Sequence, residues 1–265
     1  MSDAGLVGGP ADESPRRGRR GVRWLIAVVV LLALLAGAVV VADIVIRGIA
    51  QDQVAAGIEE QLPAEVEGEV TVEIGGFSVI QQYFAGSFDE VDLSAPALTV
   101  SGFPASAEVA LRGIPIDRSG TVTGTIDRAV GTVTIPQGSV AGLIASRGVE
   151  GDITLGEGDL QYRTSTTILG QEIGFGISAR PVIDTGRIVF APQSAQIDGA
   201  GFDFDATQLL NLVVPEGLSV CVAQYLPEAI GLRSVEIVGS AAIVDLAAQD
   251  LSLDGDALAR TGVCN

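Results

Sequence analysis

Carboxylates are the side chains of this sequence best able to do chemistry, because the chain carries 33 acidic residues but no histidine and no lysine. Histidine is the most common general base and nitrogen metal ligand, and lysine is needed for Schiff-base and Ser-Lys mechanisms, so these reactions are excluded. A pair of carboxylates acting on a glycan or a lipid-linked sugar stays formally open. The acidic residues are scattered, however, which is typical of a solvated surface, so we expect no catalytic site.

Two acidic segments resemble metal sites but are better explained as strands. Residues 250–256, with the sequence DLSLDGD, resemble the start of a calcium loop, yet the twelfth position is Thr261 and not a bidentate glutamate. Leu251 and Leu253 alternate with the polar residues, which predicts a strand running into a turn. Residues 202–205 alternate phenylalanine and aspartate in the same way. We therefore expect no metal site, and the absence of phosphate-loop and dinucleotide fingerprints predicts no cofactor.

An uncharged apolar run occupies residues 24–42 and reads WLIAVVVLLALLAGAVVVA. As a helix it would be roughly 28 Å long, close to the hydrocarbon thickness of a bilayer. Five arginines lie just before this run and Asp43 follows it, and positively charged flanks stay in the cytoplasm. The sequence predicts a single-pass anchor in the cytoplasmic membrane, with residues 1–23 as a disordered basic tail inside and residues 43–265 outside, in the periplasm or extracellular space.

Two other interpretations of residues 24–42 are open. A cleaved signal peptide would have its apolar core at residues 24–35 and a small-x-small cleavage site at Ala36-Gly37-Ala38. A buried core helix is disfavoured by the preceding arginines. Anchor and signal both export residues 43–265.

The exported part is strongly acidic. Five of the 15 arginines and three of the 33 acidic residues precede Asp43, which leaves ten arginines, 30 acidic residues and a net charge of about −20. Such a domain repels nucleic acid and anionic lipid headgroups, so we expect no nucleic-acid partner and only apolar or local membrane contact. The oxidising compartment favours a disulfide between Cys221 and Cys264, with two free thiols as the alternative.

An amphipathic helix is predicted over residues 43–62, ended by Pro63. It either continues the spanning helix or kinks near Asp43. Its apolar positions recur every four residues and are Ile46, Ala50, Val54, Ile58 and Leu62, with Ile49 filling the stripe.

After this helix the apolar period changes to two, which predicts strands separated by turns at residues 117–120 and 184–186. Alternating segments are Val70 to Ile74, Val91/Leu93, Val109/Leu111, Val122/Gly124/Ile126, Phe175/Ile177/Ala179, Phe202/Phe204 and Ala241/Ile243/Asp245. They indicate one large antiparallel sheet in a single β-rich domain. Short helices are predicted at residues 79–84, 140–146 and 207–213.

Residues 70–100, VTVEIGGFSVIQQYFAGSFDEVDLSAPALTV, resemble the actinobacterial LmeA-like phospholipid-binding proteins, a family of exported or anchored envelope proteins. The shared features are an apolar strand, Gly76-Phe77, a short apolar helix, the Gly86-x-Phe88 step and an alternating strand. Ser78 departs from the family, in which many relatives have proline, and loosens the turn slightly.

The resemblance implies an α+β, β-rich tubular lipid-binding fold like half of a bactericidal/permeability-increasing-type module. A highly curved antiparallel sheet would wrap the long amphipathic helix and leave an apolar groove for phospholipid acyl chains. It implies a noncatalytic phospholipid-binding protein of the cell envelope, which binds or transfers lipid beside glycolipid-assembly enzymes. The alternative is a structural scaffold that recruits envelope-assembly enzymes without binding lipid.

Candidate lipid contacts are apolar side chains of the amphipathic helix, the aromatic segment after it and the later short helices. They are Ile58, Leu62, Phe77, Ile80, Tyr83, Phe84, Phe88, Leu143, Ile144, Leu209, Leu210 and Val213. The aromatic segment has two equally favoured interpretations, a tip that meets membrane or lipid and a local core cluster.

The variants Ile144→Asp and Leu210→Asp test whether the short helices border a lipid groove. A groove wall tolerates a charge in the empty protein, so both variants should fold and lose phospholipid uptake. A packed core residue would instead unfold the domain, because an unpaired buried charge costs several kcal/mol. Thermal midpoint and phospholipid binding, measured side by side, separate the two cases.

Overall fold

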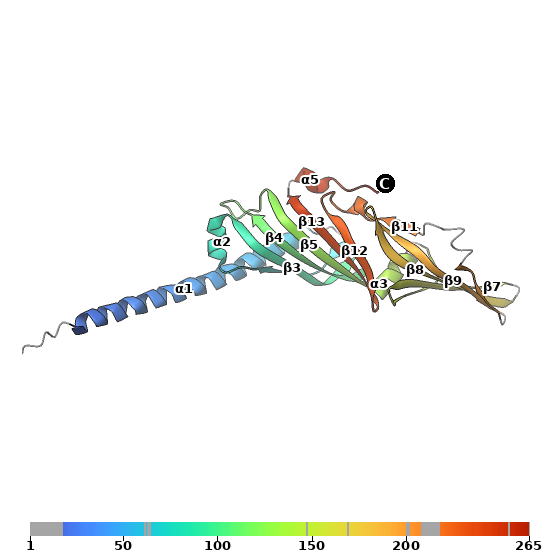
Figure 1. Ribbon diagram of the computed structural model, residues 1–265, viewed down its shortest axis with the longest axis horizontal. Coiled ribbons are helices and arrows are strands. Elements are labelled where there is room, and N and C mark those ends of the chain that lie inside the picture. Colours follow the sequence, from blue (N-terminus) through green and yellow to red (C-terminus); the bar gives the residue numbers. More distant parts are fainter. Residues whose placement is uncertain are drawn as a thin grey trace, which may run out of the picture. The chain divides into compact units, whose positions relative to one another are not determined.

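The structure is a computed structural model, and it describes residues 18–60, 62, 65–146, 148–168, 170–199, 202–207, 218–253 and 255–264 (Figure 1). The chain forms two compact units, Met1–Val45 and Ile46–Asn265. Helix α1 spans Gly18–Glu59, and every described residue of the first unit belongs to it. The helix therefore begins within the predicted tail. Between Val29 and Val45 the large apolar side chains of α1 are exposed. Among the described residues, α1 is the one helix long and apolar enough to cross a membrane.

In the second unit, α1 contributes Ala50, Ala55 and Ile58 to the packing against the core. Ile46 and Val54, which the sequence pattern assigned to the same stripe, are 44% and 43% exposed. Residues four apart advance by about 40° around a helix of 3.6 residues per turn, so a strict four-residue stripe drifts away from its partner. The predicted stripe is therefore only partly correct.

The strands form two open antiparallel sheets, and not the single sheet expected (Figure 1). The first sheet has the order β1-β3-β4-β5-β13-β12, with β2 also paired to β3. The second has the order β10-β9-β8-β7-β6, with β11 also paired to β9. The strands of the first sheet are β1 Val66–Glu67, β2 Thr71–Ile74, β3 Ser87–Val100, β4 Phe103–Pro115, β5 Thr125–Pro136, β12 Gly231–Val238 and β13 Ala241–Ser252. Those of the second are β6 Asp152–Gly156, β7 Asp159–Ile168, β8 Gln171–Asp184, β9 Arg187–Gly199, β10 Phe202–Asp205 and β11 Leu218–Cys221.

The connection through α3, Gln137–Ala145, explains why there are two sheets. After β5 the chain leaves the first sheet, builds the hairpins β6 to β10, and returns as β12 and β13, with β13 pairing with β5. The sheets meet where β12 contacts β8. The expected β-rich α+β fold with curved antiparallel sheets is confirmed.

Two of the predicted short helices lie within the described residues. Helix α2, Val79–Ala85, starts at Ser78, whose Oγ accepts a hydrogen bond from the Gln81 amide, and ends at Gly86 with a φ of 81°. Helix α3 begins three residues before its predicted start at Val140. The helix expected at residues 207–213 lies outside the described residues, apart from Thr207.

Most of the predicted strands are present, but Val122 and Gly124 precede β5, and Val122 forms an isolated bridge with Ile116. The turn at residues 117–120 is closed by the Gly120 amide donating to the Asp117 carbonyl. Residues 250–256 follow the expected course at first, since β13 ends at Ser252, and then enter the short helix α5, Gly255–Ala259. A short 3-10 turn, η1 Ala223–Tyr225, follows β11.

The closest packing lies at one end of the first sheet, where α1, α2 and β2 meet it. Eleven buried residues form this core cluster: Val70, Val72, Ile74, Val79, Val91, Ala95, Ile114, Ile126, Ala129, Ala248 and Leu251. All are small or aliphatic. The far half of the same sheet contributes little to it.

A disulfide joins Cys221, at the end of β11, to Cys264 near the C-terminus, 43 positions later in the sequence. The predicted pairing is confirmed. The bond ties the last residues of the chain to the second sheet.

Removing the disulfide should lower the stability of the domain. In the chain-entropy model, a closed loop of this length stabilises the folded state by about 4 kcal/mol. We expect the double variant Cys221→Ser, Cys264→Ser to lose a free energy of unfolding of this order in urea titrations. Wild-type protein under reducing conditions is the control and should match the double variant; equal stability of all three samples would contradict the expectation.

Candidate functional site

The register of the first sheet defines a continuous apolar face. Residues directly opposite one another across antiparallel strands share a face, and so do residues two apart along a strand. Val91, Leu111, Ala129 and Ala248 form one such row, and three of them belong to the core cluster. The next rows on this side are Leu93, Val109, Gly131, Leu246 and Leu232, then Ala95, Ala107, Val133, Val244 and Val235, then Ile135, Ala242 and Ile237. These four rows are called the inner face below, and every residue in them is apolar or glycine.

Burial of the inner face is incomplete beyond the core cluster. In the last three rows only Ala95 and Ile237 are buried, at 6% and 7% exposure, and the remaining residues are half-buried. Aliphatic residues in a closed core lose nearly all of their exposure. A face that is apolar over its whole length and only half covered can accept further apolar atoms.

The opposite face of the sheet is polar at the same level. Asp245 accepts hydrogen bonds from Ser234 Oγ at 2.5 Å and from Thr132 Oγ1 at 2.7 Å. These two hydroxyl donors, Ser234 more than Thr132, hold the pKa of Asp245 below its ordinary value. The three residues lie opposite one another on β12, β13 and β5, so the network fixes the register that separates the two faces.

The second sheet also has an apolar face. Its rows are Ile153, Tyr162, Ile177 and Ala195, and Leu155, Leu160, Ala179 and Pro192. Ile153, Leu155 and Ala195 are buried, whereas Ile177 is 36% exposed. The residues that alternate with them include Gln161, Ser178 and Ser194, which lie opposite one another.

The predicted lipid contacts do not come together in one place. Ile58 and Phe88 pack against the core cluster, and Leu62 and Ile80 are half-buried. Phe77 and Phe84, at the two ends of α2, are 93% and 82% exposed, and Tyr83 is 41% exposed. The candidates Leu209, Leu210 and Val213 lie outside the described residues.

Leu143 and Ile144 lie on α3, at the other end of the first sheet from α2. Gly86, the C-cap of α2, immediately precedes β3, whereas α3 contacts β4 near its start, where Ser139 donates to the Pro104 carbonyl. Phe103, beside Pro104, pairs with Val100 at the far end of β3. A strand of that length spans roughly 40 Å. Leu143 is 47% exposed and Ile144 is half-buried, which leaves their lipid contact a prediction.

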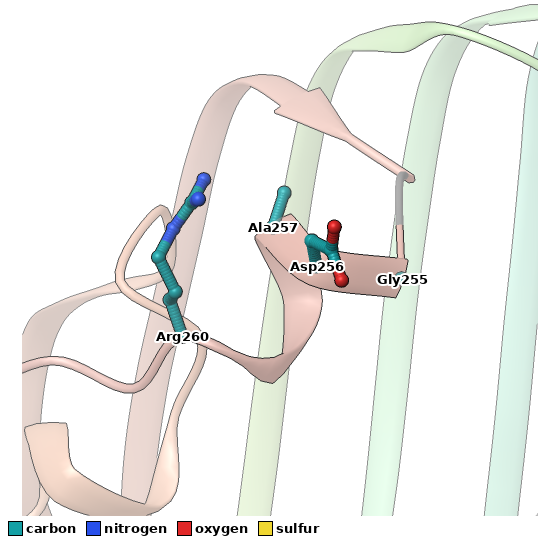
Figure 2. Close-up of a pocket in the computed structure, with 4 residues that line it drawn as sticks. All are labelled: Gly255, Asp256, Ala257 and Arg260. Atoms are coloured by element: carbon teal, nitrogen blue, oxygen red, sulfur yellow. The ribbon is translucent and has the colours of Figure 1, made fainter.

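Two surface clefts formed by the described residues are polar. A pocket of about 430 Å³ is lined by Gly255, Asp256, Ala257 and Arg260 at α5 (Figure 2). A cleft of about 670 Å³ lies between α1 and β2, and its lining includes the charged residues Arg47, Asp52, Glu59, Glu69, Glu73 and Asp92. Within the part of the chain that the structure describes, no three His, Cys, Asp or Glu side chains could hold a metal ion. Neither polar cleft suits an acyl chain.

The sequence patterns missed most of the inner face. Alternation in β13 was assigned to Ala241, Ile243 and Asp245, but these residues lie on the polar side, and Ala242 and Val244 lie on the inner face. Both alternating sets of residues in β13 contain aliphatic side chains, so the period of two alone could not show which set faces inward. Asp245 could have decided the question, because a carboxylate is expected on the polar face of the sheet.

These observations define a β-rich protein with an extended, half-covered aliphatic sheet face and polar clefts elsewhere. The chain belongs to the LmeA-like phospholipid-binding family, whose family model matches residues 41–247. Membership in this family indicates phospholipid binding. No curated protein and no solved structure matches the chain.

The hydrogen bonds at Asp245 predict a pH dependence of stability. A carboxyl group whose pKa is lower in the folded state stabilises the protein above its unfolded pKa, and this stability is lost as the pH falls through the folded pKa. Asp245→Asn should lower the free energy of unfolding at neutral pH by about 1 kcal/mol, since Asp245 is only half-buried. The free energy of unfolding of this variant should also fall less than that of the wild type when the pH is lowered to about pH 3.

Urea unfolding at both pH values checks this prediction. Glu236→Gln, an exposed acidic residue on the same face, is the control and should change neither value. An equal acid response of wild type and Asp245→Asn would show that the network does not contribute.

Proposed function

We propose that this chain is a noncatalytic protein of the cell envelope that binds phospholipid acyl chains on its inner face and carries or presents the lipid on the outer side of the cytoplasmic membrane. The observation that carries the proposal is the half-covered inner face, apolar in all four rows. Membership in the family supports a phospholipid as the ligand. The strand register supports the inner face as the site where its acyl chains bind. The candidates on α3, Leu143 and Ile144, would border the end of this face.

The energetics of acyl-chain burial fit a face without polar anchors. Each buried methylene contributes about 0.8 kcal/mol. About ten of them give roughly 8 kcal/mol, a free energy that corresponds to micromolar affinity before the costs of association. Binding therefore needs no charged contact with the headgroup, which agrees with the net charge of about −20 on residues 43–265.

Two features support the envelope location. The apolar helix at residues 24–42 has the length and composition of a membrane anchor or a signal sequence. The disulfide between Cys221 and Cys264 is favoured outside the cytoplasm. Together they support an exported second unit with the N-terminus inside.

The variant Val133→Asp tests the inner face. Val133 is half-buried in the third row, so a carboxylate there should leave the domain folded while placing a charge where acyl chains would lie. We expect phospholipid affinity to fall roughly tenfold or more, which corresponds to a loss of at least about 1.4 kcal/mol. Native mass spectrometry with lipid extraction, and titration with a fluorescent phospholipid, measure the change on the full-length chain in detergent.

Val130→Asp is the matched control, because Val130 lies on the same strand but on the opposite face, where it is 43% exposed. It should bind lipid like the wild type, with a similar thermal midpoint. Equal binding by the two variants would remove the inner face as the site. Wild-type protein that is free of lipid and takes up none would favour the scaffold that recruits envelope-assembly enzymes.

A further inference from the structure

An uncharged segment surrounds α2. No charged residue occurs between Glu73 and Asp89, although 18% of the chain is charged. The segment contains the two most exposed phenylalanines of the described residues, Phe77 at 93% and Phe84 at 82%. In a unit with a net charge of about −20, this stretch itself presents no carboxylate to an apolar partner, although Asp89 follows it and its carboxylate lies beside Gly76.

The exposure of these rings follows from how α2 is fixed. Val79 and Gln82 are buried at 3% and 6% exposure, and the Gln82 side chain donates to the Gly75 carbonyl at 2.9 Å and accepts from the Asp89 amide at 2.7 Å. At 100° per residue, Phe84 lies on the side of the helix opposite to Val79 and Gln82. The rings of Tyr83 and Phe84 are 5.9 Å apart in a T-shaped pair.

Tyr83 connects the segment to the neighbouring turn, since its hydroxyl donates to the Arg118 carbonyl. Phe84 lies in the last turn of α2, a helix only about 10 Å long, and Phe77 lies two residues before its first residue. Phe77, Tyr83 and Phe84 are together called the aromatic tip.

The aromatic tip is tied to the part of α1 that follows the proposed span. The Arg47 guanidinium donates to the Ile74 carbonyl at 2.8 Å and to the Gly76 carbonyl at 3.1 Å, next to Phe77. Arg47 is five residues beyond Ala42, the last residue of the apolar run. By covalent connectivity alone, five residues reach at most roughly 18 Å. A membrane crossed by residues 24–42 thus lies within reach of the tip.

From these observations we propose that Phe77 and Phe84 insert into the outer leaflet of the membrane that residues 24–42 cross, so that the aromatic tip is a second contact with the lipid surface. The occupant is a bilayer surface, because the exposed side chains of the aromatic tip are uncharged rings and the proposed span lies within reach of them. The inference rests on the proposed span and is independent of acyl-chain binding by the inner face.

Depth-dependent quenching tests the insertion. The full-length chain has a single tryptophan, Trp24, so the variant Trp24→Phe has no tryptophan fluorescence of its own. Phe77→Trp and Phe84→Trp are each introduced into it and reconstituted in phosphatidylcholine vesicles that contain dibrominated phosphatidylcholine. Insertion predicts a blue-shifted emission and the loss of most of the tryptophan intensity at both positions.

Tyr225→Trp in the same background is the matched control, because Tyr225 is an aromatic residue 71% exposed after β11 in the second sheet. It should show neither quenching nor a blue shift. Unquenched tryptophans at positions 77 and 84, or equal quenching at all three positions, would overturn the proposal.

A second arm distinguishes a bilayer from a single bound lipid. In excess dodecyl maltoside with one dibrominated lipid per protein, a specific lipid site stays filled, whereas contact with a lipid surface is diluted. Quenching that persists in detergent would overturn insertion and would assign the tip to a specific lipid site. Quenching that occurs only in vesicles supports insertion. Extraction of the full-length chain by alkaline carbonate would overturn the span and the tip contact together, while lipid uptake by the inner face would be unaffected.

Discussion

The register of the first sheet is the constraint on which the rest of the structure depends. Side chains alternate with a period of two, so a slip of one residue in β13 would exchange the inner and outer faces and turn Asp245 toward the aliphatic rows. The hydrogen bonds of Asp245 with Thr132 and Ser234 form only in the observed register. A small polar network on one face therefore helps to specify the aliphatic surface on the other, although none of its members lies on that surface.

Packing in the second unit is divided between two tasks. At the α2 end, α1 covers the first sheet with Ala50, Ala55 and Ile58 and closes the core cluster. Farther along, the inner face keeps its aliphatic character but has less cover. Stability can come from the closed end and from the disulfide, while the half-covered rows keep apolar surface that the chain itself does not bury.

The sequence predicted the β-rich class, the strand positions, two of the short helices and the disulfide, because these depend on local period and on cysteine chemistry. It did not predict the split into two sheets, since strand period carries no information on which strands pair. It assigned Ile46 and Val54 to a buried stripe, but residues four apart are displaced by about 40° around a helix, so a four-residue repeat does not stay on one face. The exposure of Phe77 and Phe84 also depends on tertiary structure, because Val79 and Gln82, which face inward, decide which side of α2 is left outside.

Pairing of β13 with β5 also bears on how the chain acquires its structure. Thr132 and Asp245 are 113 residues apart, and the whole second sheet is made from the residues between them. Because the chain is made from the N-terminus onward, the edge of β5 that pairs with β13 has no partner until β13 has been made. High contact order of this kind slows folding, and an open strand edge invites pairing with other chains. Completion of the first sheet is thus a late step of folding, and the edge of β5 stays open to other chains until then.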